Sequence, residues 1–168
     1  MKLEQIDKDR YRKHLNVVIV ACIVALIVGS LGIARVLIIA WPNESGSHFY
    51  WNLFGVIVTT VIIGLVLKRY QNHEFMTEVV YVWRLKQALN LITRKLAKVK
   101  AAAEQGNVMA LHTLQFNYSG CRQLWQLDDN TITMEELAIE QAKLDVLANK
   151  FNVVADAALY QPEFLKEL

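Results

Sequence analysis

VVIVACIVALIVGSLGIARVLIIAW, residues 17–41, and FYWNLFGVIVTTVIIGLVL, residues 49–67, are the two dominant features of this sequence. A helix needs about 20 mainly apolar residues to cross the roughly 30 Å of hydrocarbon in a bilayer. The first run contains one charged residue, Arg35, and the second contains none. Runs this long and this apolar are rare in soluble domains. We therefore predict transmembrane helices over residues 17–41 and 49–67.

The segment between the two runs, residues 42–48, predicts a tight periplasmic turn. It reads PNESGSH and is rich in turn formers. Two helices joined by so short a connection must be antiparallel neighbours. A charged segment precedes the first run, as in a secretory signal, but the apolar part is too long and no small-residue cleavage site follows it. We expect an uncleaved anchor.

Lysine and arginine residues near the spans predict the orientation. The lead-in, residues 1–16, and the residues directly after the second span are basic, whereas the turn contains no Lys or Arg. Basic residues are enriched on the cytoplasmic side of spanning helices. Both termini are therefore expected in the cytoplasm. The lead-in also alternates charged and apolar residues, as an amphipathic helix on a membrane surface does.

Small residues recur at four-residue intervals in both spans. The hydrophobic effect does not press helices together inside lipid, so close approach of backbones at small residues stabilises helix pairs. These stripes predict packing between the two spans or between copies of the chain, and both remain open. The residues are Ala21, Ala25, Gly29, Gly55, Thr59, Thr60 and Gly64.

Arg35 is the one ionisable residue inside an apolar run. Six residues separate it from Trp41, which places it roughly 9 Å below the outer end of the span at 1.5 Å per residue. A long side chain at this depth reaches the headgroups by snorkelling. The alternative is a functional or inter-helix role. Thr59 and Thr60 need no such role, because their hydroxyls bond the carbonyl one turn earlier.

Residues 68–168 predict a cytoplasmic helical bundle. No proline or glycine occurs in residues 68–104, so we expect one long helix, bent near QNHEF at 71–75. Gly106 ends this helix and Asn107 caps the next one. The long helix carries apolar residues at alternating gaps of three and four, a heptad seam typical of coiled coils and bundles. They are Val82, Leu85, Leu89, Ile92, Leu96, Val99 and Ala103.

A third helix is expected after a capping box at Thr133 and Glu136, and Pro162 stops or kinks it. Short connections make the three helices antiparallel neighbours. The predicted fold is therefore all-α, a two-span transmembrane helical hairpin followed by a cytoplasmic antiparallel three-helix bundle with heptad seams. The apolar face of the third helix consists of Leu137, Leu144, Leu147, Phe151, Val154 and Ala158.

The long helix exceeds its neighbours in length, which leaves FMTEVVYVW, residues 75–83, uncovered near the membrane. Exposed apolar surface of this kind marks interaction sites. We expect a homo-oligomer contact or a protein partner there. Cover by the lead-in or by the last helix is the alternative. The residues of this candidate surface are Phe75, Val79, Val80, Tyr81 and Trp83.

Charge is unevenly distributed over the bundle. Residues 68–105 carry eight basic and three acidic side chains, and residues 106–168 carry four basic and nine acidic ones. The net charges of +5 and −5 attract each other, within one chain or between copies.

Sequence patterns that carry catalytic or metal chemistry are absent. There is no glycine-rich phosphate loop and no nucleophile elbow, and Cys22 and Cys121 read as small apolar residues. We predict no enzyme activity, no cofactor, no metal site and no nucleic-acid partner. The histidines are scattered, without metal-ligand spacing: His14, His48, His73 and His112.

Four blocks of the sequence resemble a known family: MKLEQIDKDRYRKHLN, HFYWNLFGV, FMTEVVYVWRLKQALN and SGCRQLWQLDDNT. They are similar to small gammaproteobacterial inner-membrane proteins that form a family of unknown function. The likeness covers most of the chain and weakens after about residue 147. It implies a bacterial inner-membrane location and brings no activity, cofactor or binding residue.

These observations favour a membrane-anchored structural or interaction protein. It would self-associate or bind a protein partner through its cytoplasmic helices, with the lipid bilayer as its other partner. The alternative is a small channel or transport-accessory subunit built from a ring of copies, with Arg35, Thr59 and Thr60 facing the path. The seven residues between the spans are too few to fold an outer ligand domain, which argues against periplasmic sensing.

Overall fold

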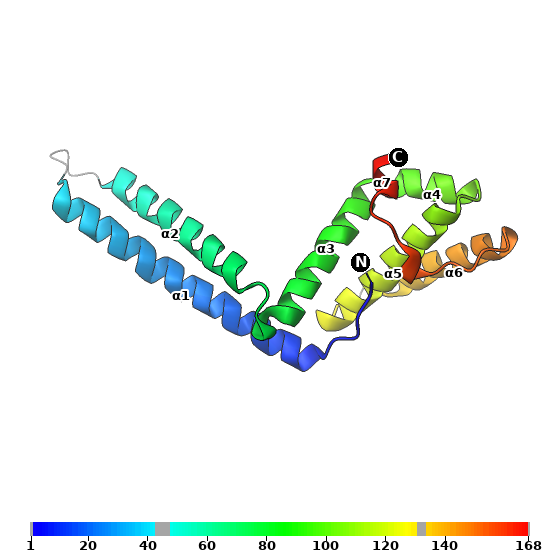
Figure 1. Cartoon of the computed structure of the whole chain (residues 1–168), viewed down its shortest axis with the longest axis horizontal. Helices are drawn as coiled ribbons and strands as arrows, with labels where there is room; N and C mark the ends of the chain where they lie inside the picture. Colours follow the sequence, from blue (N-terminus) through cyan, green and yellow to red (C-terminus); the bar gives the residue numbers. More distant parts are fainter. Residues whose placement is uncertain (1, 43–47, 131–133, 168) are drawn as a thin grey trace. The chain divides into compact units, whose positions relative to one another are not determined.

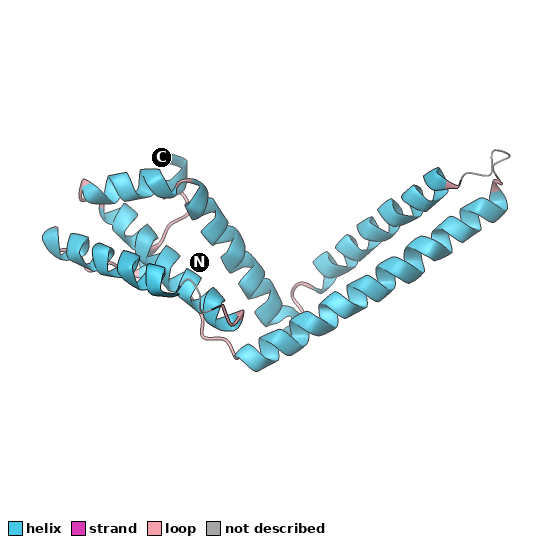
Figure 2. Ribbon diagram, turned by 180° about the vertical axis from the view of Figure 1, so that it is seen from behind, coloured by secondary structure: helices cyan, strands magenta, loops and turns pink. Residues whose placement is uncertain are grey.

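The computed structural model describes residues 2–42, 48–130 and 134–167, and every regular element in these ranges is a helix (Figure 2). The expected all-α fold is confirmed, with two apolar helices first and further helices after them. In chain order the elements are α1 (Lys8–Ala40), α2 (Phe49–Tyr70), η1 (Glu74–Met76), α3 (Thr77–Arg94), α4 (Leu96–Glu104), α5 (Val108–Leu127), α6 (Met134–Lys150), η2 (Ala157–Leu159) and α7 (Phe164–Glu167).

The chain divides into two compact units. The hairpin unit is Asp9–Val80, and the bundle unit combines Met1–Lys8 with Tyr81–Leu168. The boundary falls inside α3, whose first turn belongs to the hairpin unit. The start of the chain therefore packs with its C-terminal half.

In the hairpin unit, α1 and α2 lie side by side and run in opposite directions (Figure 1). Both helices are long and apolar enough to cross a membrane. Only 6% of the most apolar window of α1 and 11% of that of α2 is buried, so neither is a core helix within this chain. Their surface consists largely of exposed aliphatic side chains, such as Val28, Ile39 and Leu65.

The start of α1 differs from the expected lead-in helix. Residues 2–7 are not helical, and one continuous helix runs from Lys8 to Ala40. No proline or glycine lies at the border between its charged and apolar parts, so its hydrogen bonds continue across that border. Residues 2–7 are held by the bundle instead. The Glu4 N–H donates to the Tyr81 hydroxyl over 2.8 Å, and the Glu4 carbonyl accepts from the Gln123 amide over 2.5 Å.

The bend expected after the second apolar run is a complete break. α2 ends at Tyr70, and α3 starts at Thr77. The backbone of His73 is extended, and its Nδ1 accepts a hydrogen bond from the Phe75 N–H over 3.2 Å, which caps the turn leading into α3. A second interruption, at Lys95, separates α3 from α4. The predicted long helix is therefore divided among the last residues of α2, the η1 segment, α3 and α4.

The predicted heptad seam survives the interruption at Lys95, because its side chains still face α5. α5 contacts α4, α6 and η2 and is the central helix of the bundle unit. Gly120 of α5 lets α3 approach closely, since a Cβ atom there would lie 3.0 Å from the Leu89 side chain. The buried seam residues are Val82, Leu85, Leu89, Ile92, Val99 and Ala103.

The predicted turn between α4 and α5 is confirmed. Gly106 has φ +83°, and a Cβ atom there would lie 2.8 Å from the ring of Phe151. Glycine is favoured at such a position, both for its conformation and for the close approach. The Asn107 side chain accepts a hydrogen bond from the Ala110 N–H over 3.1 Å and caps α5 as expected.

The last long helix is shorter than predicted. α6 ends at Lys150, because Asn152 adopts a left-handed conformation with φ +52°. Val154, expected on the apolar face, is 87% exposed. The following chain returns along α5, where the Asp156 N–H donates to His112 Nδ1 over 3.0 Å. The Thr133 half of the predicted capping box lies outside the described residues.

Candidate functional site

Three of the predicted packing residues meet between α1 and α2. A Cβ atom on Gly29 would lie 2.7 Å from the Thr59 side chain, and one on Gly55 would lie 2.6 Å from the Ser30 carbonyl oxygen. Gly55, Thr59 and the facing Ala34 are buried. The backbones therefore approach most closely in this half of the hairpin.

Ala21, Ala25 and Gly64 lie outside this close contact. All three are exposed, and a Cβ atom on Gly64 would meet nothing within 4 Å. At 3.6 residues per turn a four-residue repeat rotates by roughly 40° at each step. The stripe in α1 therefore does not stay in tight contact with α2: the contact passes to Gly29 and Ala34, and Ala21 and Ala25 instead line an open groove between the helices.

An apolar groove lies between the other halves of the two helices. We call it the Tyr70 groove, because Tyr70 lies at its end near the break between α2 and α3. Its volume is about 470 Å³. Both helices and the η1 segment contribute to its walls. Among its lining residues are Ala21, Cys22, Ala25, Ile62, Val66 and Phe75.

Arg35 is in α1 and the two threonines are in α2, and of the three only Thr59 is buried. Arg35 is exposed, whereas its neighbour Ala34 packs on Gly55. The hydroxyls of Thr59 and Thr60 each donate to the carbonyl four residues earlier over 2.8 Å, as expected. Thr59 points into the hairpin contact, so within one chain it faces α1.

The beginning of α3 is covered by α1. Arg10 Nε lies 2.8 Å from Glu78, and His14 Nδ1 lies 3.4 Å from the other oxygen of the same carboxylate. The His14 ring stacks on Phe75 with 4.0 Å between centroids. Phe75 and Val79 are half-buried. This side of the predicted interaction surface is therefore partly occupied by α1.

The other predicted surface residues are also largely covered. Tyr81 is buried; its hydroxyl accepts from Glu4 and donates to Gln123 over 3.1 Å, and burial raises its pKa. Val80 is half-buried. Trp83 is 57% exposed. The sequence-based alternative, cover by the lead-in, thus describes Tyr81, whereas Trp83 remains accessible.

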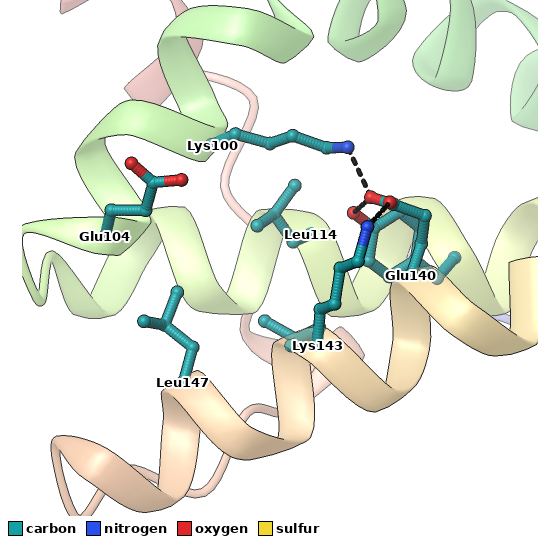
Figure 3. Close-up of a pocket in the computed structure, with 8 residues that line it drawn as sticks. Lys100, Glu104, Leu114, Glu140, Lys143 and Leu147 are labelled. Atoms are coloured by element: carbon teal, nitrogen blue, oxygen red, sulfur yellow. Dashed lines mark hydrogen bonds and ion pairs between the residues drawn. The ribbon is translucent and has the colours of Figure 1, made fainter.

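A polar pocket of about 190 Å³ lies between α4, α5 and α6 (Figure 3). Glu140 is its centre: Lys100 donates to one carboxylate oxygen, Lys143 donates to the other over 2.9 Å, and the Tyr118 hydroxyl donates over 3.2 Å. The two lysines hold the pKa of Glu140 down at about 2. Burial and the nearby carboxylate raise the pKa of Tyr118.

An ion pair in this pocket joins the basic segment, residues 68–105, to the acidic segment, residues 106–168. Lys100 belongs to the basic segment and Glu140 to the acidic one. Lys86 of the basic segment likewise pairs with Asp128 over 3.1 Å. These ion pairs join the two segments within one chain, which was one of the two alternatives.

Sequence reasoning missed one exposed apolar face. Ile139 and Val146 of α6 are 58% and 70% exposed, and Ala142 lies exposed between them. Spacings of three and four place these side chains on one side of the helix. The signal was present in the sequence, but the buried stripe of Leu137 and Leu144 on the opposite side concealed it.

No group of three or more metal-ligating side chains occurs within residues 2–42, 48–130 and 134–167. Cys22 and Cys121 are both half-buried free thiols, and burial raises the pKa of Cys121. His112 accepts a backbone hydrogen bond from Asp156. The His14 ring stacks on Phe75, and His73 accepts a hydrogen bond from the Phe75 N–H before α3.

This architecture defines an all-α protein in which a hairpin of two helices long and apolar enough to span a membrane is joined to a packed helical bundle. The chain belongs to the family described as protein of unknown function (DUF3087), whose family model matches residues 1–165. The predicted membership of a family of unknown function is confirmed. No curated protein and no solved structure matches the chain.

Proposed function

We propose that this protein is a membrane-anchored interaction protein whose bundle unit binds a second copy of the chain through α6. In this proposal α1 and α2 cross the bacterial cytoplasmic membrane, and both termini lie in the cytoplasm. The exposed aliphatic side chains of the hairpin support the membrane assignment. Each large aliphatic side chain gains about 1.5–3 kcal/mol when it leaves water.

The two ends of the hairpin support the orientation. One end carries Lys13, Lys68 and Arg69, because the start of α1 and the end of α2 lie together in an antiparallel pair (Figure 1). The other end carries Trp41 and Trp51, where the indole N–H of Trp51 donates to the Trp41 carbonyl over 3.2 Å. Basic residues favour the cytoplasmic side, and tryptophans favour the interface.

The exposed face of α6 is the observation that carries the proposed self-association. Two α6 helices can pair antiparallel about a two-fold axis midway between Ala142 and Lys143. Ile139 then lies opposite the partner's Val146, so that the same patch is used on both copies. Confinement in a membrane raises the effective concentration of the copies, so that a small patch suffices.

Charge at the ends of this face fits the same arrangement. Glu135 and Lys150 are both exposed, one near each end of α6. In the antiparallel pair each would lie opposite the other residue of the partner. Two ion pairs would then flank the apolar centre, and a parallel pairing would instead place like charges together.

Disulfide formation between copies tests this geometry. In full-length chains carrying Cys22→Ser and Cys121→Ser, Ala142→Cys should form a disulfide-linked dimer in native lipid under mild oxidation. Glu135→Cys alone should not, because the two thiols would be roughly 22 Å apart along the helices at 1.5 Å per residue. Glu135→Cys combined with Lys150→Cys should restore the dimer. Absence of the Ala142→Cys dimer, or efficient linkage of Glu135→Cys to itself, would contradict the proposal.

The membrane orientation is tested separately. A thiol reagent that cannot cross membranes should label a cysteine added after Leu168 only once the cells are lysed. Labelling of that cysteine in intact spheroplasts would contradict the proposed orientation. Extraction of the whole chain by alkaline carbonate would contradict the membrane anchor itself.

A further inference from the structure

The side of α3 that faces away from the bundle core is exposed. The opposite side carries Leu85, Leu89 and Ile92, which are buried. At 3.6 residues per turn, five exposed side chains of α3 fall within an arc of roughly 100° opposite these three. We call this arc the Trp83 face. It consists of Trp83, Arg84, Gln87, Leu91 and Arg94.

The arginines of the Trp83 face have no acidic partner among the residues that the structure describes. Neither Arg84 nor Arg94 forms an ion pair there, whereas Lys86, beside the face, pairs with Asp128 over 3.1 Å. Glu78 is the one acidic residue of α3, and it is contacted by α1. The face therefore offers two positive charges to a partner that the bundle unit does not supply.

The side chains of this face suit a membrane surface. Trp83 is 57% exposed and Leu91 is 52% exposed. An indole ring is amphipathic and favours the level of the lipid headgroups. A guanidinium group matches the geometry of a phosphate and binds it through two hydrogen bonds. Apolar and basic side chains together on one exposed helix face are typical of helices that lie on anionic membranes.

The chain keeps the start of α3 close to the end of the hairpin. Only residues 71–76 lie between α2 and α3, and Arg10 and His14 of α1 contact Glu78 in the first turn of α3. At 1.5 Å per residue, Trp83 lies roughly 8 Å further along α3 than Glu78. A membrane surface at the basic end of the hairpin is therefore within reach of the Trp83 face.

We propose that the Trp83 face lies against the anionic surface of the cytoplasmic leaflet, with Arg84 and Arg94 on lipid phosphates. This inference rests on the membrane insertion and orientation proposed above. Each arginine beside such a surface favours the bound state about fivefold. The acidic segment of a second copy also has the right charge, but Asp128 and Glu140 in it already pair with lysines of their own chain.

Fluorescence quenching in nanodiscs tests this contact. Full-length chains carrying Cys22→Ser and Cys121→Ser receive one fluorophore on a new cysteine, at Gln87 or, as the matched control, at Gln105 after α4, both of which are exposed. The nanodiscs contain phosphatidylcholine with or without phosphatidylglycerol, and a lipid with a nitroxide on its headgroup. Quenching at Gln87→Cys should be stronger with phosphatidylglycerol than without it. Quenching at Gln105→Cys should be weak in both.

Charge variants test the role of the arginines. Arg84→Gln with Arg94→Gln should lower the quenching at Gln87→Cys in phosphatidylglycerol to its level in phosphatidylcholine, with helical circular dichroism equal to that of the wild type. Arg84→Lys with Arg94→Lys keeps the charge and should retain most of the quenching. Arg122→Gln changes an exposed arginine of α5 outside the Trp83 face and should leave the quenching unchanged.

Several results would overturn the inference. They are equal quenching at Gln87→Cys and Gln105→Cys, and quenching at Gln87→Cys that does not depend on phosphatidylglycerol. Energy transfer between fluorophores at Gln87→Cys on two copies, without quenching by lipid, would assign the face to a second copy instead.

Carbonate extraction of membranes that contain the same chains separates the two proposals. A chain that resists extraction but is not quenched at Gln87→Cys refutes only the contact of the Trp83 face. A chain that is extracted refutes the membrane anchor as well.

Discussion

The hydroxyl oxygen of Tyr81 lies 2.8 Å from the backbone nitrogen of Glu4, which is 77 residues earlier in the chain. The same hydroxyl donates to Gln123 of α5. One buried tyrosine thus ties the start of the chain to two bundle helices. Together with the hydrogen bond from the Gln123 amide to the Glu4 carbonyl, this contact joins residues 2–7 to the bundle unit.

Tyr81→Phe should release the start of the chain without disturbing the bundle core. The variant loses two hydrogen bonds and leaves the Glu4 N–H without its partner, a cost of about 1 kcal/mol. Hydrogen exchange at residues 2–7 should become faster, while exchange in α5 stays unchanged. Tyr70→Phe serves as the control, since Tyr70 is 56% exposed. Unchanged exchange at residues 2–7 in Tyr81→Phe would contradict this account.

Glu140→Gln should destabilise the bundle in a pH-dependent manner. The pKa of Glu140 is lowered from 4.5 to about 2 by Lys100 and Lys143, so the folded state favours the charged carboxylate. Its stabilising effect is therefore complete above pH 4.5 and is lost as the pH falls toward about 2. The difference in free energy of unfolding between wild type and Glu140→Gln should shrink over this window.

Thermal unfolding of the full chain in detergent at a series of pH values measures this effect. Glu136→Gln is the matched control, because Glu136 lies one turn away on α6 and is exposed. A difference between wild type and Glu140→Gln that stays constant from pH 5 to pH 2 would rule out the ion-pair explanation.

Gly106→Ala should destabilise the bundle by about 1 kcal/mol or more, because a positive φ disfavours any residue with a Cβ atom. The new methyl group would also lie 2.8 Å from the Phe151 ring. Gly106→Ala combined with Phe151→Leu should recover only the steric part of the loss. The midpoint of unfolding measured by circular dichroism reports both effects, and an unchanged midpoint in Gly106→Ala would refute the expected strain.

Gly55→Ala should loosen the hairpin, whereas Gly64→Ala should not. A Cβ atom on Gly55 would lie 2.6 Å from the Ser30 carbonyl oxygen, and one on Gly64 would meet nothing within 4 Å. Small residues that let two backbones approach closely increase the van der Waals packing that stabilises helix pairs in lipid. Hydrogen exchange in α1 and α2 should be faster in Gly55→Ala than in Gly64→Ala. Equal rates in the two glycine variants would show that the contact does not hold the hairpin together.

Ile139→Asp with Val146→Asp should convert the proposed dimer into a monomer. The patch loses its apolar centre and gains repulsion between like charges across the two-fold axis. The mass of the particle extracted in native lipid should fall to that of one chain. Leu91→Asp changes another exposed apolar residue, which is 52% accessible, and should leave the mass unchanged. Dimers that persist in the α6 variant would contradict the proposed interface and would favour one that includes the exposed Trp83.

The parts of this protein that its sequence predicts are those with local causes. Two long apolar runs specify two long apolar helices, whose surface stays largely exposed within this chain and which are long and apolar enough to span a membrane. The seam in residues 82–103 predicts its buried face from periodicity alone. Gly106 and Asn107 mark a helix boundary through their own conformational preferences.

The parts that required the tertiary structure depend on residues far apart in the chain. The hydrogen bonds of Glu4 to Tyr81 and Gln123 draw residues 2–7 out of a helix that their pattern favours. The return of the chain along α5 ends α6 at Lys150 and exposes Val154. Periodicity shows which side chains share a face of one helix. It does not show which other element covers that face, because cover depends on packing between residues far apart in the chain. Only the tertiary structure therefore shows that one face of α6 is exposed and that the Tyr70 groove is open.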